Sequence, residues 1–297
     1  MDSTDARVGD SGGVSDSGGV SGTGGVSDSG RRPDERAMLA AFDRQIRRHP
    51  QPDGPDDRIE RDGDIVRVVP ARGGWAGVVW TDLDESSAPA AIAAQVARFA
   101  PLPGRWEWKH YSYDRPGDLP ERLIAAGFTP EPVESLLIAE VAEVAEVTLA
   151  VAPPAGVRLV PVTDRRGIDH LVRVHDEVFG GDHTAMGDGI LARLAERPGT
   201  LAAVVAIAGD TPIAGARIDF QAGTEFASLW GGGTLPAWRG RGVFRALVAH
   251  RVALAAAAGY RYLQVDASAD SRPILLRLGF RQVALTTPFV YGAASLR

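Results

Sequence analysis

The 297-residue sequence predicts an α/β protein with a mixed sheet, arranged as two similar halves in tandem. The second half reads as a strand, two helices, three strands, a helix, a strand, a helix and one or two final strands. The first half repeats much of this order, and a stretch of low complexity precedes both halves.

That stretch, residues 1–33, carries the hexapeptide Gly-Gly-Val-Ser-Asp-Ser at 12–17 and again at 24–29, with a variant between them. One valine in each hexapeptide is too little apolar surface to build a core. We therefore expect a disordered tail rich in glycine, serine and aspartate.

The first half spans residues 34–147. Apolar residues at helical spacing predict a helix over 35–48, followed by a polar loop at 49–57. The elements expected next are strands at 65–69 and 77–80, a helix at 89–99, a strand at 106–113, a helix at 119–126 and a strand at 135–141. The Ala-Glu-Val repeats at 139–147 fit neither a strand nor a helix, so they mark the boundary, with a linker at 148–156.

The second half spans residues 157–297. The expected elements are a strand at 157–162, helices at 169–179 and 190–195, strands at 201–207, 213–220 and 226–230, a helix at 242–258, a strand at 262–267 and a short helix through 274–276. Three glycines at 231–233 end the strand that begins at 226, which is typical of a bulge or of a ligand close to the backbone.

The most informative stretch, residues 239–245 (Arg-Gly-Arg-Gly-Val-Phe-Arg), joins this strand to the long helix. Its glycines permit a tight turn that directs successive amide N–H groups at one place, and the first turn of the helix adds unpaired donors. Its arginines match phosphate oxygens, so we expect a diphosphate to bind here. A dinucleotide fingerprint starting at Gly240 would need glycine or alanine in place of Arg245, and no Gly-Lys-Ser/Thr of a Walker loop is present.

The remaining pattern resembles the acyl-CoA site of the GNAT superfamily of N-acetyltransferases, which reads Arg or Gln, two residues, Gly, one residue, then Gly or Ala. Arg239, Gly242 and Phe244 stand at these positions, and Phe244 is larger than the usual residue. The Leu-Gly-Phe sequence at 278–280 also resembles the family. The resemblance covers residues 157–292 and implies the GNAT fold, with acetyl-CoA as co-substrate.

In that fold the strand before the loop carries a bulge, and pantetheine lies between it and its neighbour. The resemblance and the loop chemistry together imply a set of cofactor-binding residues: Gly232, Gly233, Thr234, Arg239, Gly240, Arg241, Gly242, Val243, Phe244 and Arg245. The implied reaction moves an acetyl group directly to the amine of a small-molecule or peptide acceptor. The alternative is a catalytically silent module that binds or senses acyl-CoA.

The first half resembles a degenerate copy of the second, because its Leu-Ile-Ala-Ala-Gly-Phe at 123–128 parallels 275–280. The segment that would hold a diphosphate in this copy, 81–87, has three carboxylates and no glycine. Like charges repel an anion, so we expect no CoA there. The first half then either completes a wall of the acceptor site or packs structurally.

Catalytic groups are less clear from the sequence. Many family members have a tyrosine four residues before the glycine of the Gly-Phe ending, but here that residue is Leu275, and the asparagine often found seven residues earlier is Ser268. The donor for the leaving thiolate stays open among Ser268, Tyr291 and water. Glu225 and Asp219 are the candidates for the base, because both lie on or near strands that would face the acceptor, although Glu225 is equally typical of a solvated turn.

Acceptor contacts are expected near the first two helices of the second half, from His175, Asp182 and His183, which are otherwise ordinary loop-surface residues. The scattered histidines show no metal-site spacing, and there is no cysteine.

A net charge of −6 argues against nucleic acid as the main partner. The apolar runs are too short for a membrane span and no targeting signal is visible, so a cytoplasmic location is expected. The oligomeric state, including a homodimer, stays open.

Overall fold

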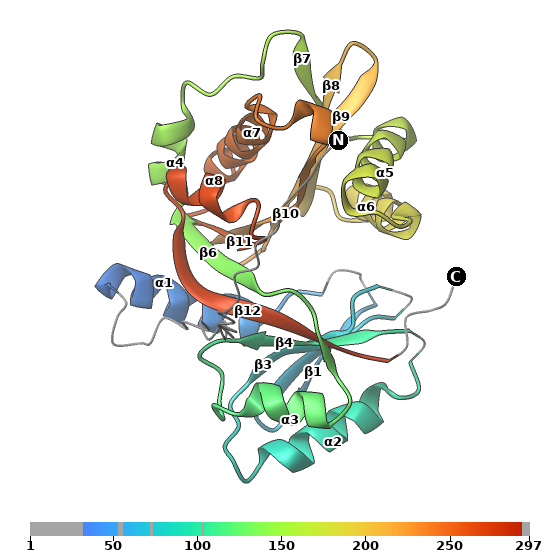
Figure 1. The fold of residues 1–297 in the computed structure, drawn as a ribbon, viewed down its shortest axis with the longest axis vertical. Helices are drawn as coiled ribbons and strands as arrows, with labels where there is room; N and C mark the ends of the chain where they lie inside the picture. Colours follow the sequence, from blue (N-terminus) through green and yellow to red (C-terminus); the bar gives the residue numbers. More distant parts are fainter. Residues whose placement is uncertain (1–31, 53–55, 72–73, 103, 293–297) are drawn as a thin grey trace, which may run out of the picture.

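The computed structural model describes residues 32–52, 56–71, 74–102 and 104–292 (Figure 1). Apart from its last two residues, the predicted tail lies outside the described residues.

Within the described residues, every strand belongs to one mixed sheet. The strands of the first half are β1 (Arg58–Asp62), β2 (Ile65–Val69), β3 (Gly77–Thr81), β4 (Trp106–Tyr111), β5 (Thr129–Pro130) and β6 (Glu134–Glu140). Those of the second half are β7 (Val157–Pro161), β8 (Leu201–Ala208), β9 (Thr211–Phe220), β10 (Phe226–Thr234), β11 (Tyr262–Ala267) and β12 (Arg281–Tyr291). They lie in the order β1-β2-β3-β4-β12-β6-β11-β10-β9-β8-β7, and β5 pairs with β12.

The two halves exchange their last strands at the centre of this sheet. Strand β6 of the first half lies between β11 and β12, and β12 of the second half lies between β4 and β6 (Figure 1). All of these pairings are antiparallel, and the side chains of β6 lie in cores on both faces. Each half therefore depends on a strand of the other for its hydrogen bonding.

Helices cover both faces of the sheet (Figure 1). The first half contributes α1 (Pro33–Phe42), a π-helical turn (Asp43–Arg47), α2 (Ala88–Phe99), α3 (Leu119–Ala125) and α4 (Val141–Thr148). The second half contributes α5 (Arg165–Phe179), α6 (Thr184–Glu196), α7 (Val243–Ala257) and α8 (Arg272–Arg277). In α5, Ile168, Leu171, Val174 and His175 recur at helical spacing and are buried.

The structure corrects the prediction for residues 139–147. They end β6 and then form α4, whose Val141, Val144 and Thr148 are buried at spacings of three and four. Val141 and Val144 pack in the same core as Val248 and Val252 of α7. A repeat of three residues is close to the 3.6 residues of a helical turn, so the valines fall on one face of the helix, and α7 packs against this face.

Two further differences have simple causes. Strand β1 was not predicted because its sequence, Arg-Ile-Glu-Arg-Asp, is charged, as befits a strand at the edge of a sheet. Strand β10 continues through the three glycines to Thr234, because pairing with β9 resumes at Gly233.

Candidate functional site

The C-terminal part of strand β10 separates from β11. The two strands pair in parallel only over 226–228 and 262–264, and the register of β10 on β9 shifts between Trp230 and Gly233. Gly231 in this bulge has φ +57°, a left-handed conformation that glycine adopts readily. The backbones of β10 and β11 therefore diverge from residue 229 onward.

The packing around the bulge explains why its three residues are glycines. A Cβ atom on Gly231 would lie 2.7 Å from the ring of His175, and one on Gly232 would lie 3.0 Å from the ring of Phe244. A Cβ atom on Gly233 would lie 3.0 Å from Val178. Side chains thus press on the bulge from α5 on one face and from α7 on the other.

The loop after β10 forms the predicted turn. Gly240 and Gly242 have φ of +73° and +87°, and α7 begins at Val243 directly after them. No side chain of the described residues caps the start of this helix. Its first N–H groups are thus available to an anion, which the helix dipole also favours.

A cavity of about 300 Å³ lies against this turn. Its lining comes from the end of β10, the loop, the start of α7 and the turn into α8: Thr234, Trp238, Arg239, Gly240, Gly242, Val243, Phe244, Arg245, Asp270, Ser271, Ile274 and Arg277. Arg239 Nε donates a hydrogen bond to Thr234 O at 3.2 Å, which holds this side chain beside the cavity. The Oγ1 atom of Thr234 is buried and has no hydrogen-bond partner among the described residues.

Most of the predicted cofactor-binding residues meet at this cavity, but three do not line it. Gly232 and Gly233 lie in the bulge behind it, and the guanidinium of Arg241 stacks 5.0 Å from the ring of Trp238. The sequence interpretation missed the residues that the turn into α8 supplies. A ligand that binds between two diverging strands also meets the turn that follows the second of them. The turn after the predicted strand 262–267 could therefore have been included in the site from the sequence alone.

Glu225, the predicted base, is not brought to the cavity. It stands before the first residue of β10, roughly 20 Å along the strand from the bulge. Its carboxylate accepts a hydrogen bond from Gln45 Nε2 at 2.6 Å and lies 3.3 Å from Arg261, and both contacts lower its pKa. Glu225 thus links Gln45 of the first half to Arg261 of the second half, at the turn before β10.

The residues considered as thiolate donors lie in different places. Ser268 follows β11, and its Oγ is 3.2 Å from the Oγ of Ser271, which lines the cavity. Tyr291 packs on Trp106 and Phe128 in the first half. Leu275 is buried in the apolar core of the second half.

The polar residues expected to face an acceptor are engaged within the protein. The carboxylate of Asp219 lies 3.3 Å from the guanidinium of Arg193 and 3.4 Å from that of Arg217. Arg217 is on β9, and its partner across the sheet is Trp230 of β10. His183 Nδ1 lies 2.9 Å from the carboxylate of Asp176.

His175 holds the bulge from the α5 side. Its Nε2 donates a hydrogen bond to Gly231 O at 3.0 Å, and burial, aided by the proximity of His183, lowers the pKa of His175 from 6.5 to about 4. The ring is therefore neutral near neutral pH and its donor is fixed on the bulge.

This pKa makes the stability of the protein depend on His175 in acid. Above pH 6.5 the ring is neutral in both states, but as the pH falls toward 4 the unfolded chain takes up the proton first, so the free energy of unfolding falls. Urea unfolding should show the wild type losing about 2 kcal/mol more than His175→Gln between about pH 7 and about pH 5. Equal losses in the two proteins would contradict this assignment.

In the first half, the turn after β3 corresponds to the turn after β10, because each follows the first of two parallel strands and leads into a helix. In the turn after β3, the carboxylate of Asp84 takes the place of an external anion. The carboxylate of Asp84 accepts hydrogen bonds from the backbone N–H of Ser86 and of Ser87 at 2.9 and 2.8 Å. The hydrogen bond from the Ser86 hydroxyl, together with these backbone bonds, lowers the pKa of Asp84 to about 2. The amides that would bind a phosphate are already paired.

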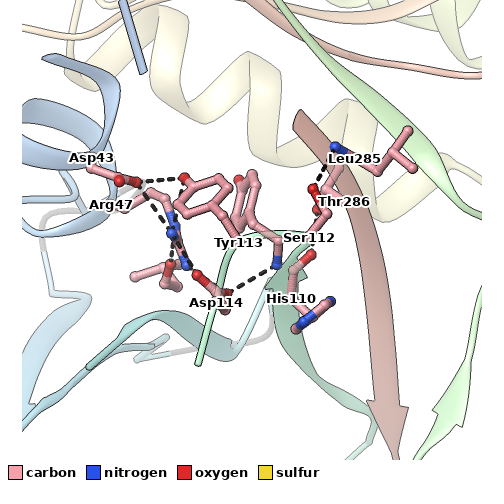
Figure 2. Close-up of polar contacts among 10 residues, drawn as sticks. Asp43, Arg47, His110, Ser112, Tyr113, Asp114, Leu285 and Thr286 are labelled. Carbon is pink, nitrogen blue, oxygen red and sulfur yellow. Dashed lines mark hydrogen bonds and ion pairs between the residues drawn. The ribbon is translucent and has the colours of Figure 1, made fainter. Parts of the chain in front are cut away.

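The side chain of Arg47 fills the space where β3 and β4 diverge. These strands pair only at 77–78 and 107–108, and the buried guanidinium of Arg47 lies just beyond, where its Nε donates to Val79 O at 3.0 Å. Figure 2 shows it held between Asp43, Tyr113 and Asp114. Thr286 of β12 donates to His110 O in the same view, at 2.9 Å.

Comparison with known proteins agrees with this architecture. A sequence profile described as the acetyltransferase (GNAT) family matches residues 171–280. No curated protein sequence matches the chain significantly.

Among solved structures, a GCN5-related N-acetyltransferase from Kribbella flavida superposes with a TM-score of 0.62 at 19% identity, covering 89% of this chain and 96% of its own. A functionally unknown conserved protein from Staphylococcus epidermidis gives 0.58 at 13% identity, with coverages of 79% and 94%. A tandem GNAT protein from the clavulanic acid biosynthesis pathway gives 0.53 at 14% identity, with coverages of 82% and 86%. The predicted mixed α/β fold is thereby confirmed, and residues 171–280 form a domain that matches the acetyltransferase (GNAT) family.

Proposed function

We propose that this chain transfers an acetyl group from acetyl-CoA to the amine of a small-molecule or peptide acceptor. The observation that carries the proposal is the cavity at the start of α7, where two left-handed glycines, uncapped helix amides and arginines meet beside diverging strands. Phosphate groups are bound in proteins by this combination.

In this proposal the diphosphate lies on the first turn of α7, with Arg239 and Arg245 beside it. The unpaired hydroxyl of Thr234 fits a polar group of the pantetheine chain, since a buried hydroxyl without a partner costs free energy. The thioester lies at the bulge, where backbone N–H groups released from the β10–β11 pairing polarise its carbonyl.

The amine nitrogen attacks the thioester carbonyl carbon, the C–S bond breaks and its electron pair passes to sulfur, giving a thiolate. The proton that the amine loses goes to solvent. Holding the two reactants side by side supplies much of the rate enhancement in such a direct transfer. The hydroxyls of Ser268 and Ser271 form a short relay beside the cavity that can return a proton to the thiolate.

The first half is proposed to hold no acyl-CoA, because Asp84 and Arg47 occupy the equivalent turn and divergence. Its strand β6 lies beside β11, so it supports the site through the sheet.

No helix of the described residues is long and apolar enough to cross a membrane. The same part of the chain has no group of three or more side chains that could hold a metal ion.

A second function, binding acyl-CoA without transfer, is favoured by the apolar, buried Leu275 at the position where the family resemblance implies tyrosine. Turnover separates the two. The chain has no cysteine, so a thiol reagent reports only the CoA that the reaction releases. We expect thiol release from acetyl-CoA that depends on an amine from a mixed panel. Binding of acetyl-CoA with no release above the uncatalysed rate for any amine would favour the binding module instead.

A further inference from the structure

Helix α7 carries a buried arginine, Arg251, on its side toward the bulge of β10. Arg251 is 2% exposed, its Nε donates to Leu247 O at 3.0 Å and its Nη1 donates to Arg217 O at 3.2 Å. Within the part of the chain that the structure describes, no carboxylate lies within ion-pair distance of it. Burial lowers the pKa of Arg251 to about 9, so the group is still charged near neutral pH.

A buried charge without a partner is strongly unfavourable, and an apolar side chain of similar volume commonly gives an equal or more stable protein. The fold therefore does not need an arginine at this position. Its two hydrogen bonds to backbone carbonyls fix where the charge lies, and they leave the charge without a counter-ion.

The charge lies directly behind the bulge of β10. A Cβ atom built on Gly232 would be 3.5 Å from Arg251 Nη2 and 3.0 Å from the ring of Phe244. Phe244 lines the cavity, so Arg251 and Phe244 lie side by side between α7 and the bulge. The lack of a side chain at Gly232 lets the guanidinium approach the backbone where β10 and β11 diverge.

We propose that Arg251 provides the positive charge that stabilises the CoA thiolate as it leaves the thioester. The inference rests on the proposed function, and it concerns the bulge behind the cavity, where Arg251 lies next to Phe244 without lining the cavity itself. When the amine–carbon bond forms and the C–S bond breaks, the sulfur carries a full negative charge next to the bulge. Arg251 keeps its protons throughout and acts through its electrostatic field, which a low-dielectric surrounding strengthens. It thus compensates for the hydroxyl that Leu275 lacks.

Few other ionisable groups face Arg251. The neighbouring His250 has its pKa lowered by burial and by the charge of Arg251, and it lines a separate apolar cavity between α4 and α7. From β9, Arg217 presents its backbone carbonyl. His250→Gln is therefore a suitable control for titrations on this protein.

The test is the pKa of the CoA thiol when CoA is bound to the intact chain, followed by the ultraviolet absorbance of the thiolate, with desulfo-CoA as blank. Binding of CoA is measured by calorimetry on the same samples. On the wild type and on His250→Gln, the thiol pKa should lie below that of free CoA by about one unit or more, as for thiols beside a cationic side chain. Arg251→Gln, which keeps a hydrogen-bond donor without the charge, should raise it toward the free value, while Arg251→Lys should keep it low.

The outcomes separate the inference from the proposed function. If the wild type binds CoA but its thiol titrates like that of free CoA, the role of Arg251 is overturned and the CoA site stands. The same conclusion follows if Arg251→Gln binds CoA with an equally lowered thiol pKa. If the wild type shows no CoA binding, the proposed function is overturned and the inference with it. The wild-type measurement decides even if Arg251→Gln does not fold.

Discussion

Replacing Arg239 by alanine should weaken acetyl-CoA binding by about 10- to 100-fold, because a hydrogen-bonded charge pair contributes about 1.5–3 kcal/mol. Arg239 lines the cavity, and its bond to Thr234 O orders its side chain before any ligand arrives. The substitution removes this charge and leaves the left-handed glycines and the helix amides in place. Calorimetric titration of the wild type and the variant gives the two dissociation constants directly.

Arg166→Ala is the matched control, since Arg166 is an exposed arginine on α5 that lies outside the cavity lining. It should bind acetyl-CoA with the wild-type dissociation constant. Equal affinities for all three proteins would mean that Arg239 does not contact the ligand, and the assignment of the diphosphate to this turn would be wrong.

The second large effect concerns folding. A fragment of residues 157–297 should not fold alone, because β11 and β12 are each paired to β6, which the fragment lacks. Without β6 and β4, β12 loses its neighbours in the sheet and β11 keeps only its short pairing with β10. The core under α7 also loses Leu137 and Ala139. Circular dichroism of the fragment should resemble that of an unfolded chain, and co-expression with residues 32–156 should restore a folded complex.

The intact chain should accordingly unfold in one step. Tryptophans lie in both halves, Trp108 in the core of the first and Trp238 beside the cavity, so fluorescence and circular dichroism should give coincident urea transitions. Two separated transitions, or a folded 157–297 fragment that binds acetyl-CoA, would show that the strand exchange is dispensable.

The sequence predicted the local features of the site because they depend on local chemistry. Gly240 and Gly242 adopt the positive φ that their turn requires, and β10 forms a bulge at its three glycines, as the sequence predicted. Local chemistry also governs residues 81–87, where the carboxylate of Asp84 accepts hydrogen bonds from the backbone amides of Ser86 and Ser87.

Long-range pairing could not be predicted in the same way. Strand β6 was expected as a strand, but its periodicity does not reveal that its neighbours are β11 and β12. The sequence places Glu225 near the start of β10, but its contacts with Gln45 and Arg261 join residues that are distant in the chain, so they could not be predicted. Arg251 was not singled out because an arginine in a helical pattern is usually assigned to the solvent-exposed face.

We propose that acetyl-CoA binds at the bulge and loop of the second half and nowhere in the first. Hydrogen exchange of the intact chain, with and without saturating acetyl-CoA, tests it most directly. We predict slower amide exchange at 231–245 and 268–277 and unchanged exchange at 81–88. Protection at 81–88, or no protection at 231–245 while acetyl-CoA is bound, would contradict the account.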